Sequence, residues 1–185
     1  MTHIGHSEKV SIMKRLLLIF ILLLCACSNS QNNDIKFDID LPEGFQIEES
    51  ENKYNLLFAS KYKDGEIISR IEVRYSDDWS FLSDITDNDE FISGMIDNQY
   101  AEEEISIAYD NIEIHSKEKI YLKGVGDVYS LMFSGDFYST GGRVVNFGVQ
   151  FLKNGKHYTL LGQTYPKYIS EELKDYLKSF DTFKL

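Results

Sequence analysis

The fold is decided by residues 143–164, which read RVVNFGVQFLKNGKHYTLLGQT. Asn154-Gly155 separates two runs of alternating residues and is typical of a two-residue hairpin turn. Pairing outward from that turn sorts the side chains onto two different faces. One face joins Val145, Phe147, Val149 and Phe151 to Thr164, Gly162, Leu160 and Tyr158, and the other is more polar, with Asn146, Gln150, Thr159 and Gln163. The segment therefore predicts an antiparallel hairpin with a defined register.

A second hairpin is predicted around Asp64-Gly65, another dipeptide that tolerates positive φ at both positions. Pairing Lys63 with Glu66 sets the register, and a slip of one residue would destroy the sorting of its faces. One face pairs Tyr54, Leu56, Phe58 and Tyr62 with Tyr75, Val73, Ile71 and Ile67. The other pairs Asn55 and Lys61 with Arg74 and Ile68, and Leu57 with Glu72.

Further strands are predicted over 35–40, where Ile35, Phe37 and Ile39 alternate with polar residues, and over 112–122 and 128–137. Two stretches show helical spacing instead. The first contains Phe91, Ile92, Met95, Ile96 and Tyr100. The second follows Ser170 as N-cap and contains Leu173, Tyr176, Leu177 and Phe180. This order predicts an α+β domain with a largely antiparallel sheet and helices packed on it.

The chain resembles the PsbP/DcrB-like α/β/α sandwich family over nearly all of residues 35–185. The resemblance is carried by Leu41-Pro42-Glu43-Gly44-Phe45, the Asp64-Gly65 hairpin, the mid-chain helix, the long meander and Leu177-Lys178-Ser179-Phe180. It implies a binding or assembly factor, because the family shares no catalytic constellation to carry over. Bacterial members of that fold are often lipoproteins.

The N-terminus is similar to the leader of bacterial lipoproteins. Lys14-Arg15 precedes nine apolar residues, Leu16 to Leu24, and the lipobox-like Leu24-Cys25-Ala26-Cys27 follows. Nine helical residues rise only about 14 Å, which is too short to cross a bilayer core. We expect a signal peptide over 1–26, a lipidated Cys27 with a flexible tether over 27–34, and one globular domain over 35–185. Met13 is an alternative start, which would make residues 1–12 an over-called extension.

The charge of the chain argues against a nucleic-acid partner. The formal net charge is −11, and removing residues 1–26, whose net charge is +2, leaves −13 for the mature part. Phosphates require Lys and Arg, so we expect a protein partner, with a cationic one as an option. The candidate contacts are Trp79, Asp84, Asp87 and Asp89, next to the mid-chain helix.

The residues give little support to catalysis or metal binding. Both cysteines lie in the leader region, so the mature domain has neither a disulfide nor a thiol nucleophile. His115 and His157 lack the spacing of metal ligands, and we expect both at strand surfaces. The acidic run 84–90 lacks the glycine and glutamate of a calcium loop and is better explained by helix capping and solvation. We predict no cofactor, no metal and no enzymatic activity.

We therefore expect a membrane-anchored cell-envelope lipoprotein that acts as a non-enzymatic protein-binding or accessory factor. Ser28 after the lipidated cysteine resembles the pattern that directs Gram-negative lipoproteins to the periplasmic face of the outer membrane. The alternative is a small-ligand carrier with a pocket between sheet and helix, and an uncharacterised hydrolase is a third reading. A preformed apolar pocket would favour the carrier, whereas a flat aromatic patch would favour the protein-binding factor.

Overall fold

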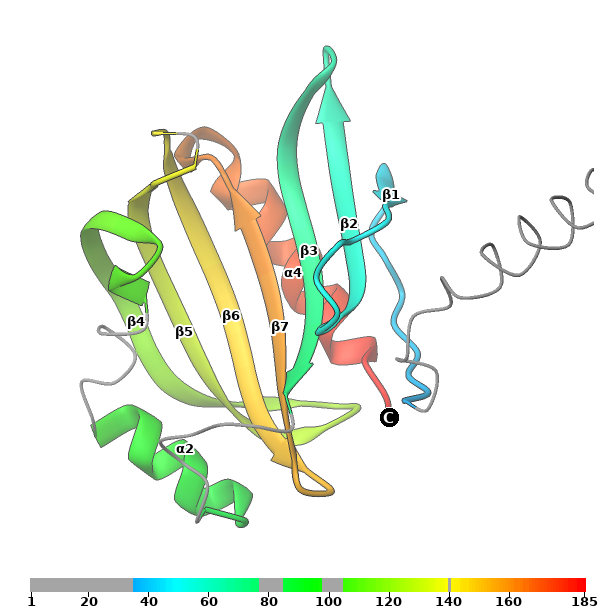
Figure 1. Cartoon of the computed structure of the whole chain (residues 1–185), viewed down its shortest axis with the longest axis vertical. Helices are drawn as coiled ribbons and strands as arrows, with labels where there is room; N and C mark the ends of the chain where they lie inside the picture. Colours follow the sequence, from blue (N-terminus) through cyan, green and yellow to red (C-terminus); the bar gives the residue numbers. More distant parts are fainter. Residues whose placement is uncertain (1–34, 77–84, 98–104, 140) are drawn as a thin grey trace, which may run out of the picture. The chain divides into compact units, whose positions relative to one another are not determined.

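Seven antiparallel strands form one sheet in the order β1-β2-β3-β7-β6-β5-β4 (Figure 1). The computed structural model describes residues 35–76, 85–97, 105–139 and 141–185. The predicted α+β class and antiparallel sheet are confirmed. The elements are β1 (Phe45–Ile47), β2 (Asn55–Lys63), β3 (Glu66–Ser76), α2 (Asn88–Asp97), β4 (Tyr109–Leu122), β5 (Gly126–Phe137), β6 (Arg143–Lys153), β7 (Lys156–Thr164), a 3-10 turn (Pro166–Tyr168) and α4 (Ile169–Thr182).

The β6–β7 hairpin has the predicted register along its whole length. Lys153 pairs with Lys156 next to the turn, and Val145 still pairs with Thr164 at the far end. Asn154 and Gly155 both have positive φ, of 54° and 71°, as the two central positions of this turn type require. The hairpin therefore places Phe147, Val149 and Leu160 on one face of the sheet and Asn146 and Gln163 on the other.

The β2–β3 hairpin departs from its predicted register in the middle. Tyr62 pairs with Ile67 as predicted, but Lys61 pairs with Ser69, so that Ile68 has no opposite residue. This bulge moves Phe58 from Ile71 to Glu72, and the predicted pairing returns only at Asn55 and Arg74. A bulge inserts one residue and reverses the facing of the next ones, so Phe58 shares a face with Glu72.

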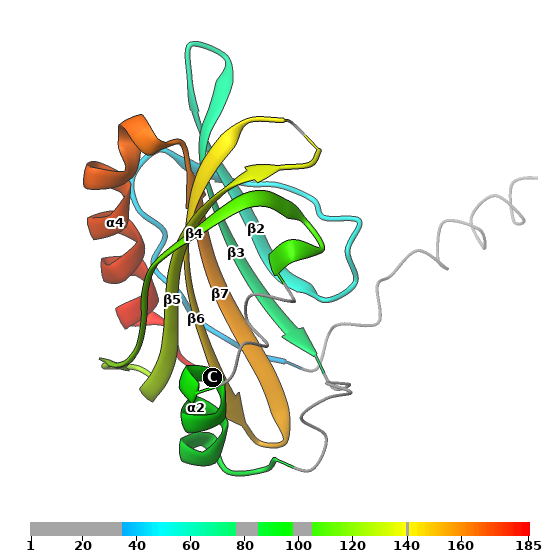
Figure 2. The same ribbon diagram turned by 90° about the vertical axis from the view of Figure 1, so that its left-hand side faces the viewer.

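Helix α4 covers one face of the sheet (Figures 1 and 2). Its Tyr176, Phe180 and the following Phe183 are fully buried against strand residues that include Phe147 and Leu160. Gly162 of β7 allows this approach, since a Cβ there would lie 2.4 Å from the Tyr176 ring. The helix is thereby held flat against the centre of the sheet.

Two details of the predicted C-terminal helix are wrong. The helix begins at Ile169 after Tyr168, so Ser170 lies inside it, and no side chain caps its N-terminus by a hydrogen bond. Leu177 is 39% exposed, whereas Glu172 and Ser179 are buried. The buried residues of α4 are Glu172, Tyr176, Ser179 and Phe180, so the buried stripe is rotated away from Leu177.

The opposite face is covered at one end by α2 (Figure 2). Phe91, Ile92 and Met95 of α2 pack with Tyr129 and Leu131 of β5, whereas Val128 packs on the α4 side. Successive strand residues point to opposite faces, so the two helices lie on different sides of the sheet. Tyr100, predicted in this helix, is outside the described residues. The remainder of this face forms the candidate site.

The predicted strand over 35–40 is an extended segment outside the sheet. Its one bridge joins Asp38 to Lys184, while Ile35, Phe37 and Ile39 pack against the α4-side core. The alternation of apolar and polar residues over 35–40 correctly indicated that one side of the segment is buried. The segment pairs with the C-terminal end of the chain, however, and not with a strand of the sheet. No helix in the described ranges is long and apolar enough to cross a bilayer.

Candidate functional site

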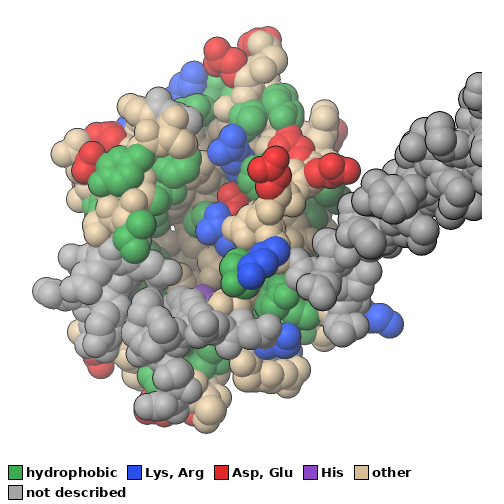
Figure 3. All heavy atoms as spheres, viewed as in Figure 1, with side chains coloured by type: hydrophobic (Ala, Val, Ile, Leu, Met, Phe, Trp, Pro, Cys, Tyr) green, Lys and Arg blue, Asp and Glu red, His purple; other side chains and the backbone are tan. Residues whose placement is uncertain are grey.

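A hollow of about 280 Å³ lies on the sheet face opposite α4. Figure 3 views this face and shows Lys and Arg side chains lying along its middle. Its lining combines charged, amide and apolar side chains from strands β3 to β7 and from the segment before β4. They are Arg70, Glu72, Arg74, Ile105, Ala108, Tyr109, Leu131, Phe133, Phe137, Gln150, Thr159, Leu161 and Gln163.

A buried amide network forms part of this site. Gln163 Nε2 donates to the hydroxyl oxygen of Tyr109 over 2.9 Å and to Asn146 Oδ1 over 3.0 Å. The Tyr109 hydroxyl in turn donates to Asn146 Oδ1 over 3.2 Å, and burial raises the pKa of Tyr109. Asn146 Nδ2 and Gln150 Oε1 are buried, and no described residue forms a hydrogen bond with either atom. Buried polar groups are nearly always paired, so these two atoms leave hydrogen-bonding capacity for a ligand or water.

Of the two arginines in the hollow, only Arg74 forms an ion pair with a described residue. Arg74 binds Glu72, its neighbour two residues along β3, with 2.7 Å from Nε to Oε2. Arg70 has no ion pair or side-chain hydrogen bond to any described residue, and its Nε is buried. Its guanidinium instead lies 5.7 Å from the centre of the Phe58 ring. The bulge of β3 creates this arrangement, because it turns Phe58 to the face that carries Arg70.

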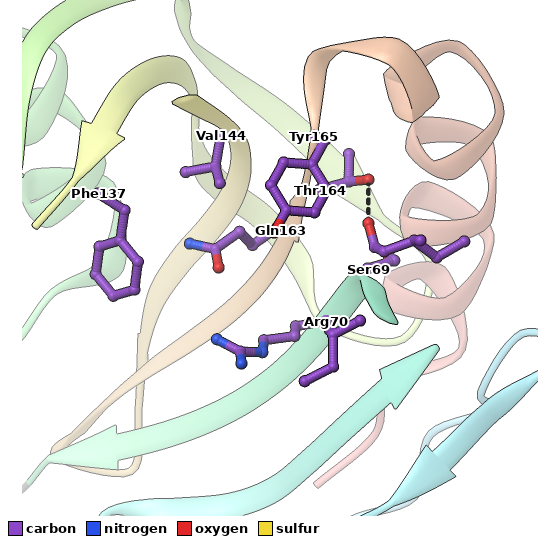
Figure 4. Close-up of a pocket in the computed structure, with 9 residues that line it drawn as sticks. Ser69, Arg70, Phe137, Val144, Gln163, Thr164 and Tyr165 are labelled. Atoms are coloured by element: carbon purple, nitrogen blue, oxygen red, sulfur yellow. Dashed lines mark hydrogen bonds between the residues drawn. The ribbon is translucent and has the colours of Figure 1, made fainter. Parts of the chain in front are cut away.

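Arg70 also lines a second, smaller hollow beside the first, of about 50 Å³. Arg70, Phe137 and Gln163 belong to both hollows, so the two are continuous along β3 and β7. In Figure 4 the guanidinium of Arg70, the amide of Gln163 and the ring of Phe137 point into the same space. Next to Gln163 in β7, the Thr164 hydroxyl donates to the Ile68 carbonyl over 2.7 Å at the bulge.

A larger hollow, of about 650 Å³, lies between α4 and the chain before β1, but its lining is mostly charged or polar. Lys61, one of its lining residues, forms an ion pair with the buried Glu172, with Nζ 2.8 Å from Oε1. Burial lowers the pKa of Lys61, but the hydrogen bonds and charges of Glu172 and Asp175 together outweigh it, and the pKa is raised. Leu41 and Pro42 are its only apolar lining residues, so this hollow lacks the walls of a carrier pocket for apolar ligands.

The predicted partner contacts are only partly described. Cys27, Trp79 and Asp84 lie outside the described residues. Asp87 caps α2, because its Oδ1 accepts hydrogen bonds from the amides of Asp89 and Glu90 over 2.9 and 3.0 Å. The Asp89 side chain is exposed, with one oxygen 4.0 Å from Lys119 Nζ.

The two histidines differ from each other. His115 is partly exposed on β4, with Nε2 3.1 Å from the Ser134 hydroxyl. His157 is 5% exposed and packs against Phe91, which corrects the predicted surface position. Within the described ranges, no three His, Cys, Asp or Glu residues are grouped to hold a metal ion.

Sequence reasoning did not assign Arg70 or Tyr109 to a site. The available signal was the polar face of residues 143–164, which contains Asn146, Gln150 and Gln163. This pattern does not indicate that β3 pairs with β7, which brings Arg70 to the same face. It also does not indicate that Tyr109 of β4 forms a hydrogen bond with Gln163 of β7.

No family model matches this sequence, and no curated protein is similar to it in sequence. Solved structures similar in fold include LpqN of Mycobacterium tuberculosis, which is involved in cell envelope biogenesis, with a TM-score of 0.55 and 10% identity over 83% of this chain and 86% of LpqN. They also include PsbP (CyanoP) of Synechocystis, with a TM-score of 0.50 and 12% identity over 86% of this chain and 99% of that protein. The predicted PsbP-like fold is thus confirmed.

Proposed function

We propose that this chain is a lipid-anchored, non-enzymatic binding factor of the bacterial cell envelope, and that its binding face is the sheet face opposite α4. The observation that carries the proposal is the exposed apolar rim beside the hollow. Ile107 is 78% exposed and Tyr138 is 54% exposed. They are neighbours, because the Tyr138 hydroxyl donates to the Ser106 carbonyl and its amide to the Ala108 carbonyl. Exposed apolar and aromatic groups around a concave site are typical of protein contacts.

The anchor is proposed from the leader. The apolar run to Leu24 and the following Cys25-Ala26-Cys27 support lipidation of Cys27 and placement at a membrane surface. In a Gram-negative cell, Ser28 supports the periplasmic face of the outer membrane. The predicted contacts Asp84, Asp87 and Asp89, which follow Trp79 in the sequence, remain part of the proposal as residues that attract a cationic partner.

Replacing Cys27 with serine is expected to abolish incorporation of labelled palmitate in cells. The reason is that only Cys27 stands at the lipidated position of the lipobox-like motif, and its thiol carries the lipid. Cys25→Ser is the matched control and should remain labelled, because this residue leaves with the leader. Palmitate labelling of Cys27→Ser would contradict the anchor.

The partner proposal is tested by photo-cross-linking in intact cell envelopes. A photoreactive amino acid at Tyr138 should capture a specific protein, because this side chain stands at the rim of the hollow. The control position is Tyr121, which is 70% exposed at the other end of the β4–β5 hairpin. Equal capture from both positions, or none from Tyr138, would refute the rim as a protein contact.

A second candidate, small-ligand binding, is favoured by the hollow itself. Its volume of about 280 Å³ is near the lower limit of small-molecule sites, and apolar walls surround a few polar groups. Of the hollows described above, this one comes nearest to the pocket expected for a small-ligand carrier. It lies between the sheet and the segment before β4.

A further inference from the structure

We propose that the hollow binds a small organic carboxylate with an apolar or aromatic body, and that Arg70 holds the carboxylate. This inference rests on the second candidate function, small-ligand binding, and is independent of a protein partner. It begins from the charge of the site. The lining residues Arg70, Arg74 and Glu72 leave one positive charge in the hollow of a chain whose net charge is −11.

Arg70 is the source of that charge. Glu72 is bound to Arg74, and no acidic side chain among the described residues pairs with Arg70. The chain has 30 acidic residues, so it is unexpected that none of those in the described ranges pairs with this partly buried arginine. Burying a charged group without a partner is unfavourable, and a guanidinium matches a carboxylate through two parallel hydrogen bonds. The missing partner is therefore best supplied by an anionic ligand.

The rest of the lining indicates the body of that ligand. Leu131, Phe133, Phe137 and Leu161 form apolar walls, which would be poorly matched by inorganic phosphate or sulfate. Phe137 and Arg70 line both hollows and face the same space, so one ligand can place its carboxylate at Arg70 and its apolar body against Phe137 (Figure 4).

The unpaired amide atoms add a polar contact to this ligand. The Gln150 side-chain oxygen is a buried acceptor in the same lining, and the Asn146 amide nitrogen is a fully buried donor in the network behind it. A hydroxyl or amide group on the ligand, or a water retained with it, would satisfy the Gln150 oxygen. This polar contact is secondary, and Arg70 determines the preference for an anion.

The test uses fluorine NMR on the full-length chain in lipid nanodiscs, with empty nanodiscs as the blank. The probes are para-trifluoromethyl phenylacetate, its neutral primary amide, and trifluoroacetate, which lacks the apolar body. We expect saturable binding of the aryl acid. The amide should bind about tenfold weaker or more, because it loses a hydrogen bond between charged groups. Trifluoroacetate keeps the carboxylate but should also bind about tenfold weaker or more, because it buries no apolar body. Arg70→Met should weaken the acid about tenfold or more and leave the amide unchanged.

Two further variants make the result specific. Arg70→Lys retains the charge without the forked geometry, so the acid should bind with intermediate affinity. Arg143→Met removes a guanidinium that is already paired with Glu113 and is outside the hollow, so binding should not change. Amide binding by Arg70→Met reports that the hollow is still folded.

The contrary outcomes are distinguishable. If the acid and amide bind equally, or if Arg70→Met does not weaken the acid, the hollow binds small ligands but the assignment of Arg70 is overturned. If no probe saturates at about 1 mM, both this inference and the small-ligand candidate are overturned. The protein-partner proposal is judged separately, by the cross-linking at Tyr138.

Discussion

Replacing Phe180 with alanine is expected to lower the free energy of unfolding by about 3–5 kcal/mol. The Phe180 side chain is fully buried and stacks on Phe147 of β6, with 5.9 Å between ring centres, and on Tyr176 of α4, with 6.3 Å. Truncation leaves a cavity between helix and sheet, because the neighbouring rings are held by their own packing. Urea denaturation followed by circular dichroism measures the loss.

Leu177→Ala is the matched control within the same helix. Leu177 is 39% exposed, so its truncation should cost no more than about 1 kcal/mol. The pair also tests the rotation of α4, because the sequence pattern places both residues on one buried stripe. Similar losses for both variants would refute the docking of α4 described above.

Acidification is expected to destabilise the protein through His157. Burial lowers the pKa of His157 from its ordinary 6.5 to about 3, so the folded protein keeps the ring neutral. The unfolded chain binds a proton below pH 6.5, so this stabilisation is full above that pH and is lost as the pH falls toward 3. The free energy of unfolding should therefore decrease by roughly 2 kcal/mol between pH 7 and pH 5.

His157→Gln should remove this pH dependence, whatever its effect at neutral pH. His115→Gln is the control, because His115 is partly exposed on β4, and that variant should retain the dependence. Urea midpoints measured at both pH values give the comparison. An unchanged slope in His157→Gln would show that other groups account for the acid sensitivity.

The contrast between the two hairpins shows how far sequence patterns reach. In β6–β7 every predicted pair is observed, because only one face of the hairpin is strongly apolar and the turn sets the register. In β2, apolar residues point to both faces, with Leu57 toward α4 and Phe58 toward the hollow. Either register of the β2–β3 hairpin would then bury a similar set of apolar side chains. The bulge at Ile68 therefore depends on tertiary packing, which the alternation of apolar and polar residues does not indicate.

By itself the sequence determined the α+β class, the turns at Asp64-Gly65 and Asn154-Gly155, the approximate strand and helix ranges, and a polar face on residues 143–164. These features depend on residues close in the chain, where periodicity and turn conformation act directly. Tertiary structure alone decided the rotation of α4, the burial of His157 and the meeting of Arg70 with Tyr109 and Gln163. These depend on which distant strands and helices pack together, and many half-buried elements fit one another equally well until the whole core is assembled.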